Sequence, residues 1–180
     1  MSAGAAALAL FDRLCTGAPA AVFDAARAPG VLTDAQNDTD PPATLCLFQG
    51  ETATTLADLA PYAADLSPGA PARAWVETYW GEGAFVLIDA KAEISQLRRG
   101  LRRLSLAYGP DGEALFFRFY DPRVFAATAQ SFRAPHRRAF LACLTAVFVE
   151  TARGEALLQL SFSETAVHRT RFEIAAHDLA

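Results

Sequence analysis

Residues 112–124 read GEALFFRFYDPRV, an aromatic stretch that runs directly into the start of a helix. The large apolar and aromatic side chains favour a β-strand over 114–120. Asp121 is a good N-cap residue, and Pro122 suits the first helical position because that N–H would have no intrahelical partner. We therefore expect the strand to pass at once into a helix that ends near Gln130.

A helix with one apolar and one basic face precedes this segment. Apolar side chains at the i, i+3, i+7 and i+10 spacing of one buried stripe predict a helix over residues 93–104; they are Ile94, Leu97, Leu101 and Leu104. The opposite face carries Arg98, Arg99, Arg102 and Arg103. Such a patch suits phosphates or an acidic protein segment, although a merely solvated helix face has the same pattern.

Turn-forming residues between the helix and the aromatic strand predict a β-hairpin, with strands at 105–108 and 114–120 and a turn at 109–112. Earlier in the chain, short apolar runs predict strands at Ala20–Asp24, Thr44–Phe48, Tyr62–Leu66 and Ala84–Asp89. Amphipathic spacing predicts helices over Ala3–Phe11, Thr54–Leu59 and Ala72–Trp80. Residues 27–44 are rich in Pro, Gly, Asn and Asp, so we expect the longest loop there.

After a short helix that begins at Pro135 and ends near Leu141, the pattern changes to strands. Thr145–Thr151, Ala156–Phe162 and Val167–Ile174 are separated by turn residues and predict a β-meander. The fold class expected is α/β in the sense of mixed α+β: a central mixed sheet flanked by helices, with a C-terminal helix-plus-β-meander portion. A chain of 180 residues most simply forms one domain, which would span residues 1–180.

Composition narrows the classes of function. The net charge of −4 is unlike the basic excess of a nucleic-acid-binding protein. The first apolar segment is much shorter than the roughly 20 residues that span a membrane, and no basic residue precedes it, so a cytoplasmic protein is expected. The spacing of Cys15, Cys46 and Cys143 indicates neither a disulfide framework nor a zinc site. The 13 Phe would suit a protein that leaves apolar surface for a partner.

Candidate catalytic residues are few. Asp24 and Asp89 each end an apolar strand, where two carboxylates could act as acid and base with Arg118 on a small phosphate or carboxylate ligand. The alternative is that each aspartate caps a turn or pairs with an arginine, and that Arg118 pairs with Asp24, Asp89 or Asp121 at the corner between strand and helix. The histidines, His136, His168 and His177, have no metal-binding spacing, so no metal or cofactor is expected.

Several segments in order resemble one bacterial family. They are VFDAA at 22–26, CLFQG at 46–50, APY at 60–62, YWG at 79–81, LRRGLRR at 97–103 and FRFYDPR at 117–123. Together they are similar to the domain of unknown function 4123 over roughly residues 20–140. The last segment is the most specific of these motifs.

The resemblance implies a cytoplasmic, non-enzymatic adaptor or chaperone of the type VI secretion system. Such an adaptor binds a cognate toxic effector and loads it onto the spike protein, with no nucleic acid bound and no membrane insertion. The family has no established catalytic residues. The signature therefore implies a role in shaping the fold or a docking surface for Phe117, Arg118, Phe119, Tyr120, Asp121, Pro122 and Arg123. Residues 141–180 are the possible cargo-reading part, and an open strand edge there could accept a strand from the cargo.

Overall fold

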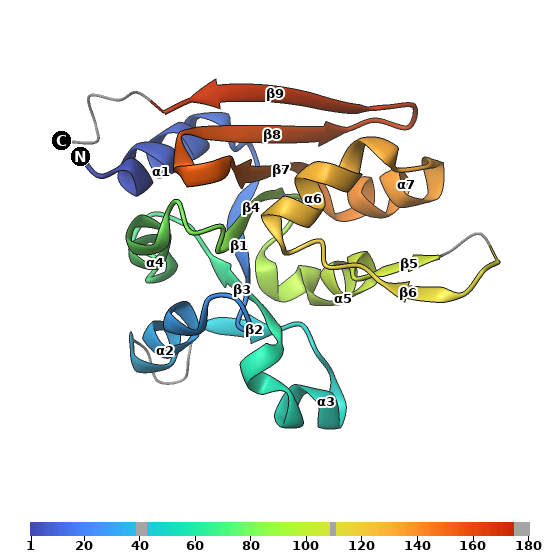
Figure 1. Cartoon of the computed structure of the whole chain (residues 1–180), viewed down its shortest axis with the longest axis horizontal. Coiled ribbons are helices and arrows are strands. Elements are labelled where there is room, and N and C mark those ends of the chain that lie inside the picture. The colour runs from blue at the N-terminus through green and yellow to red at the C-terminus, as the bar shows by residue number, and fades with distance from the viewer. Residues whose placement is uncertain (39–42, 109–110, 175–180) are drawn as a thin grey trace.

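A seven-stranded sheet forms the centre of the protein in the computed structural model, which describes residues 1–38, 43–108 and 111–174 (Figure 1). Its order is β2-β3-β1-β4-β7-β8-β9, and every neighbouring pair is antiparallel. The strands are β1 (Ala18–Asp24), β2 (Thr44–Cys46), β3 (Pro61–Asp65), β4 (Phe85–Ala90), β7 (Leu144–Glu150), β8 (Ala156–Phe162) and β9 (Val167–Glu173). The α+β class and the C-terminal meander are confirmed, while the sheet is antiparallel instead of mixed in direction.

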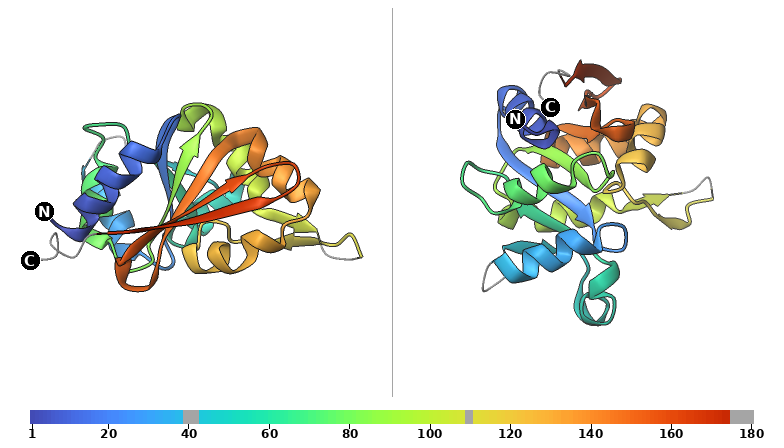
Figure 2. Two further views of the ribbon diagram at one scale, coloured as in Figure 1. Left: turned by 90° about the horizontal axis from the view of Figure 1, so that it is seen from above. Right: turned by 60° about the vertical axis from the view of Figure 1, so that its left-hand side comes forward.

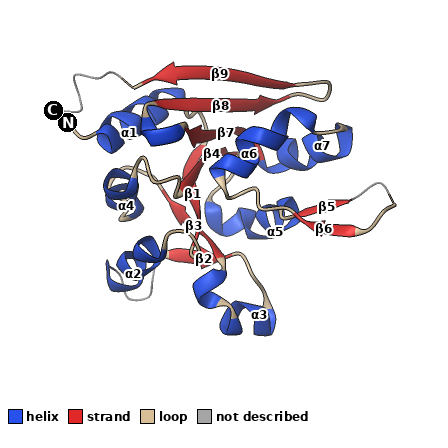
Figure 3. Ribbon diagram, in the orientation of Figure 1, coloured by secondary structure: helices blue, strands red, loops and turns tan. Residues whose placement is uncertain are grey.

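Helices cover both faces of this sheet (Figures 1 and 3). One face carries α1 (Ala3–Leu14), α2 (Pro29–Asp38) and α4 (Ala72–Tyr79). The other carries α5 (Ile94–Leu104), α6 (Pro122–Thr128) and α7 (Ala134–Cys143). A short helix, α3 (Gly50–Thr55), follows β2. All six residues of β4 are buried because this strand lies in the middle of the sheet with a layer of helices on each side.

The sheet therefore separates two hydrophobic cores. Alternate side chains of β4 enter opposite cores, with Phe85 and Leu87 on one side and Val86 and Ile88 on the other. The first core contains the aromatic residues Phe11, Phe23, Trp75, Phe85 and Phe148. The second contains Phe119, Tyr120, Phe125, Phe140 and Phe162. The apolar stripe predicted for α5 packs into the second core through Leu97, Leu101 and Leu104.

The loop predicted for residues 27–44 is wrong over most of its length, because α2 occupies Pro29–Asp38. Proline fits the first turn of a helix, so Pro29 starts the helix that its presence was expected to prevent. Val31, Leu32 and Ala35 form a buried stripe. Residues 39–42, the remainder of that prediction, lie outside the described residues.

Two side-chain hydrogen bonds hold α2 against α4. The Tyr79 hydroxyl donates to Asp34 Oδ2 at 3.0 Å, and Trp75 Nε1 donates to Asp38 Oδ2. Asp38 is one of the polar residues that made the segment look like a loop. The partners of both carboxylates lie about 40 residues away in sequence, so local patterns contain no sign of these bonds.

The hairpin is shorter than predicted. Strands β5 (Leu106–Tyr108) and β6 (Ala114–Phe116) form a separate two-stranded sheet that stands clear of the body of the protein (Figure 2). The predicted continuation of the strand to Tyr120 is wrong, because Phe119 N–H donates to the Phe117 carbonyl in a tight turn. The turn directs Phe119 into the second core. Gly109 and Pro110, in the predicted turn, lie outside the described residues.

A close contact between α5 and α7 explains why Gly100 interrupts the arginine-rich helix. A Cβ atom at this position would lie 2.3 Å from Cys143 Sγ. The short separation of the two helices therefore depends on glycine at 100.

We expect Gly100→Ala to lower the free energy of unfolding by about 1–2 kcal/mol, because overpacking outweighs the gain in helix propensity. In a Cys143→Ala background the clash is absent, and the same change should stabilise the protein by up to about 1 kcal/mol. Urea unfolding of the four variants of this cycle measures both effects. Stabilisation by Gly100→Ala alone would contradict the close contact.

Glu150 at the end of β7 holds the connection between α4 and β4. Its two carboxylate oxygens accept hydrogen bonds from the N–H groups of Gly81 and Ala84. Glu150 is almost completely buried. Burial raises the pKa of this carboxyl group to about 6, although the backbone donors act in the opposite direction.

Because the folded pKa of Glu150 is above its unfolded value of 4.5, the folded state binds the proton more tightly. Its contribution to stability is complete below pH 4.5 and is lost as the pH rises through about 6. The wild-type protein should therefore lose about 2 kcal/mol relative to Glu150→Gln between pH 4.5 and 7. Urea unfolding of both proteins across this range measures the difference. Parallel stability curves would show that Glu150 does not titrate there.

Candidate functional site

The signature segment, residues 117–123, forms the corner between β6 and α6. Phe119, Tyr120 and Asp121 point inward and are buried, whereas Arg118 and Arg123 remain partly exposed. The predicted cap is confirmed: Asp121 Oδ1 accepts the Arg123 N–H at 3.0 Å, and Pro122 lies in the first turn of α6. The Arg123 guanidinium also pairs with Asp121 at 3.0 Å, and these bonds lower the pKa of that carboxyl group despite its burial.

An ion pair joins this corner to the central sheet. Arg118 pairs with Asp24, which ends β1 and whose Oδ1 also accepts the Ala26 N–H at 3.0 Å. The Arg118 guanidinium lies 6.0 Å from the centre of the Tyr120 ring. Burial, followed by the charge on Asp24, raises the pKa of the Tyr120 hydroxyl to about 12. Of the three carboxylates considered for Arg118, Asp24 is therefore the partner.

Asp89 lies at the other end of the sheet. In the β1–β4 register it is opposite Pro19, five residues before Asp24 and hence about 16 Å away along the strand. Its oxygens accept hydrogen bonds from the backbone and hydroxyl of Thr16 and from the Gly17 N–H, at 2.8–3.0 Å. The hypothesis that Asp24, Asp89 and Arg118 form one acid–base site is therefore wrong. Both aspartates instead hold turns of the chain.

The four arginines of α5 do not form one uniform patch. Arg102 donates to the carbonyl oxygens of Leu47 and Phe48, at 2.8 and 2.7 Å, and so fixes the chain after β2. Arg98 is half-buried. Arg99 and Arg103 are exposed, and their side chains make no ion pair or hydrogen bond with the rest of the described chain. Only part of the predicted patch is thus available to a partner.

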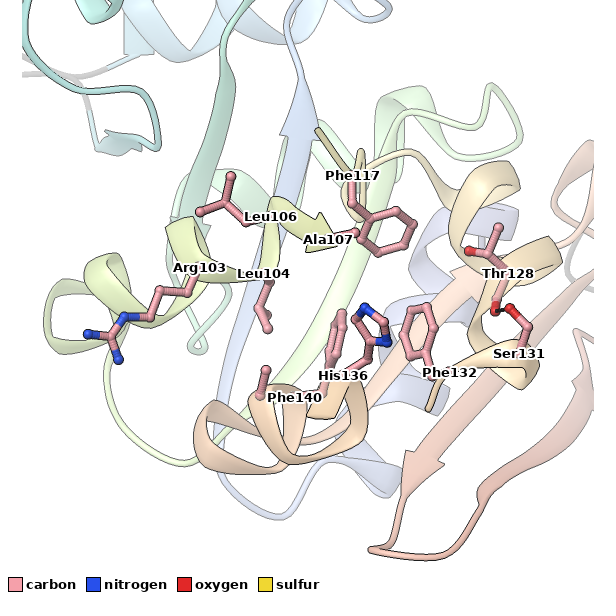
Figure 4. A pocket seen from close by; sticks show the side chains of 11 residues that line it. Arg103, Leu104, Leu106, Ala107, Phe117, Thr128, Ser131, Phe132, His136 and Phe140 are labelled. Atoms are coloured by element: carbon pink, nitrogen blue, oxygen red, sulfur yellow. Dashed lines mark hydrogen bonds between the residues drawn. The ribbon is translucent and has the colours of Figure 1, made fainter. Parts of the chain in front are cut away.

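An apolar groove opens beside Arg103, between the end of α5, β5 and α7. It consists of a pocket of about 190 Å³ and an adjoining one of about 580 Å³, which share Arg103, Leu106, His136 and Ala139. Figure 4 shows Phe117, Phe132 and His136 pointing toward one another in the smaller pocket, with the Arg103 side chain directed away from them. We call this surface the α5–α7 groove.

This groove was not predicted from the sequence. Its signal was the four-residue spacing of Phe132, His136 and Phe140, which places these side chains on one face of the chain entering α7. That spacing is equally typical of an ordinary core helix. Phe140 is indeed buried, while Phe132 and His136 are only half-buried.

The hairpin next to the groove exposes large apolar side chains. Phe116 is 57% exposed, and Leu106 and Leu115 are 47% and 46% exposed. Leu106 is opposite Phe116 in the β5–β6 register, so these two side chains share one face of the hairpin. The apolar surface therefore continues from the groove onto the hairpin.

Within the described residues, no helix is long and apolar enough to cross a membrane, and no three His, Cys, Asp or Glu side chains gather as metal ligands would. His177 lies outside the described residues. The described part of the chain thus combines an α+β fold with an exposed apolar surface edged by arginine.

Residues 21–139 match the family model described as domain of unknown function DUF4123. The match covers more than half of the chain, and the protein therefore belongs to this family. It begins within β1, includes β2 to β6, α6 and the signature corner, and ends within α7. No curated protein and no solved structure matches the chain.

Proposed function

We propose that this protein is a cytoplasmic adaptor of the type VI secretion system, which binds one toxic effector and loads it onto the spike protein. The observation that carries the proposal is membership of the family over residues 21–139, because the resemblance to that family implies such an adaptor. In this role the protein acts by protein–protein contact, without catalysis, a cofactor or bound nucleic acid.

The exposed apolar surface supports this proposal. An exposed hydrophobic patch on a folded protein marks an interaction site more often than a hydrophilic surface does. Leu106, Leu115 and Phe116 stand on a hairpin that projects from the body (Figure 2), and all three side chains are exposed.

The proposal is tested by affinity capture of the tagged full-length protein from its native cells, followed by mass spectrometry. We expect one large toxin-like protein, with or without a spike component. A strain that lacks the captured protein's gene and an unrelated tagged protein serve as controls. Loss of toxin delivery on deletion of the adaptor gene, with spike secretion intact, would add support. Reproducible recovery of no partner would count against the adaptor function.

The C-terminal strands need a more selective test than deletion. Because β7 pairs with the central strand β4, removal of residues 144–180 would take a buried strand from the sheet and expose both cores. The possibility that cargo adds a strand concerns β9, which is the last strand in the sheet order. Surface substitutions on β9 therefore test this possibility and leave the sheet intact.

A further inference from the structure

We propose that the α5–α7 groove holds a short segment of the effector that carries apolar side chains flanked by carboxylates. This inference rests on the proposed adaptor function and adds the surface used and the chemistry of the segment. Its basis is the combination of an apolar floor, arginines without partners at the edge, and an apolar extension onto the hairpin.

The groove has the size and lining of a site for side chains. The two pockets have volumes of about 190 and 580 Å³. The larger one falls in the range of ligand sites, which typically combine apolar walls with a few polar groups. Phe117, Phe132 and Phe140 line the smaller pocket. Leu106 belongs to both pockets, so an occupant that fills them would also touch the hairpin.

The positive charges around the groove favour an acidic segment as its occupant. Among the described residues neither pocket is lined by an aspartate or glutamate, and the sequences of α5 and α7 contain arginines but no acidic residue. Arg103 and Arg133 lie at the edge, and neither guanidinium group makes an ion pair or hydrogen bond with the described residues. In a protein with net charge −4, this concentration of positive charge favours carboxylates at this surface.

Two other partners fit these observations less well. An added strand on β9 would meet charged side chains, since Arg169 and Arg171 are both exposed, a pattern that protects edge strands from pairing. A nucleic acid would be repelled by the acidic protein as a whole. An apolar segment with carboxylates matches both the floor and the edge of the groove.

Site-specific photocrosslinking in native cells tests the inference. Benzoylphenylalanine replaces Ala139 in the groove of the full-length protein, or Thr170 on β9 as the control, since both residues are exposed. We expect Ala139 to crosslink the same protein that the unmodified adaptor captures. The crosslinked peptide should contain apolar residues and at least two carboxylates, and the Thr170 probe should give no such product.

A charge-reversal pair gives an independent readout. The double variant Arg103→Glu, Arg133→Glu should reduce effector recovery at least tenfold. The control double variant Arg169→Glu, Arg171→Glu changes the net charge by the same amount, but on β9. Effector recovery with this control should be unchanged. Circular dichroism and thermal unfolding verify that both pairs remain folded. All four side chains are solvent-accessible, so folding should be preserved.

The outcomes separate the inference from the proposed function. Effector capture with a crosslink only at Thr170, or at neither position, overturns the groove assignment and leaves the adaptor function intact. A product at Ala139 that nuclease removes also overturns it, in favour of nucleic acid. Failure to capture any effector with the unmodified protein overturns the adaptor function and the inference with it.

Discussion

Phe125→Ala should lower the free energy of unfolding by about 3–5 kcal/mol, as truncation of a fully buried phenylalanine typically does. Phe125 has no exposed surface and lies in the first turns of α6, directly after the signature corner. Its ring centre is 5.4 Å from that of Phe140, 6.0 Å from that of Phe132 and 6.3 Å from that of Phe162. Alanine would leave a cavity where α6, α7 and β8 meet.

Chemical denaturation monitored by circular dichroism measures this loss. Phe116→Ala is the matched control, because it removes the same side chain from a position that is 57% exposed, and it should cost less than about 1 kcal/mol. The packing indicates that the second core depends on Phe125. Equal stability of the two variants would contradict this dependence. A loss of partner binding in Phe116→Ala without unfolding would separate docking from stability.

Arg118→Met should destabilise the protein more than Asp24→Asn does. Removal of the arginine leaves a carboxylate that is almost fully buried without its cation, whereas removal of the charge on Asp24 leaves an arginine whose side chain is 43% exposed and can be solvated. We expect losses of about 2–3 kcal/mol and about 1 kcal/mol, below the full cost of breaking a completely buried pair. Asparagine keeps an oxygen that can accept the Ala26 N–H.

The double variant provides the test of this asymmetry. If the cost of Arg118→Met comes from the unpaired carboxylate, Asp24→Asn should recover about 1 kcal/mol or more in the Arg118→Met background. Urea unfolding of the four proteins gives the coupling energy. Additive losses would mean that Arg118 stabilises the corner mainly through its packing against Tyr120 and not through Asp24.

These contacts divide the signature segment into two parts. The inward residues Phe119, Tyr120 and Asp121 fill the second core and cap α6, while Arg118 ties the corner to β1. Phe117 alone of the seven lines the groove. The signature therefore has a direct structural role, and it contributes Phe117 to the proposed docking surface.

The elements with strong local patterns were predictable from the sequence. The apolar stripe of α5, the Asp121–Pro122 start of α6 and the three strands of the meander each depend on side-chain spacing within a few residues. The fold class follows from the order of these elements. The antiparallel direction of the sheet does not, because it depends on which strands pair over long distances.

The errors have a common physical origin. The polar residues of α2 find partners on α4, the aromatic strand turns inward at Phe117, and Asp89 binds the turn before β1. In each case a tertiary contact outweighs a local preference worth less than about 1 kcal/mol per residue.

The amino-acid sequence by itself determined the helices and strands with strong periodicity, the capped start of α6 and the family signature, because each of these is encoded within a short stretch of chain. Only the tertiary structure decided that Asp24 pairs with Arg118, that Asp89 lies at the opposite end of the sheet and that α5, β5 and α7 enclose a groove. The physical reason is that a site of this kind consists of side chains brought together by packing, and packing partners distant in sequence leave no periodic pattern.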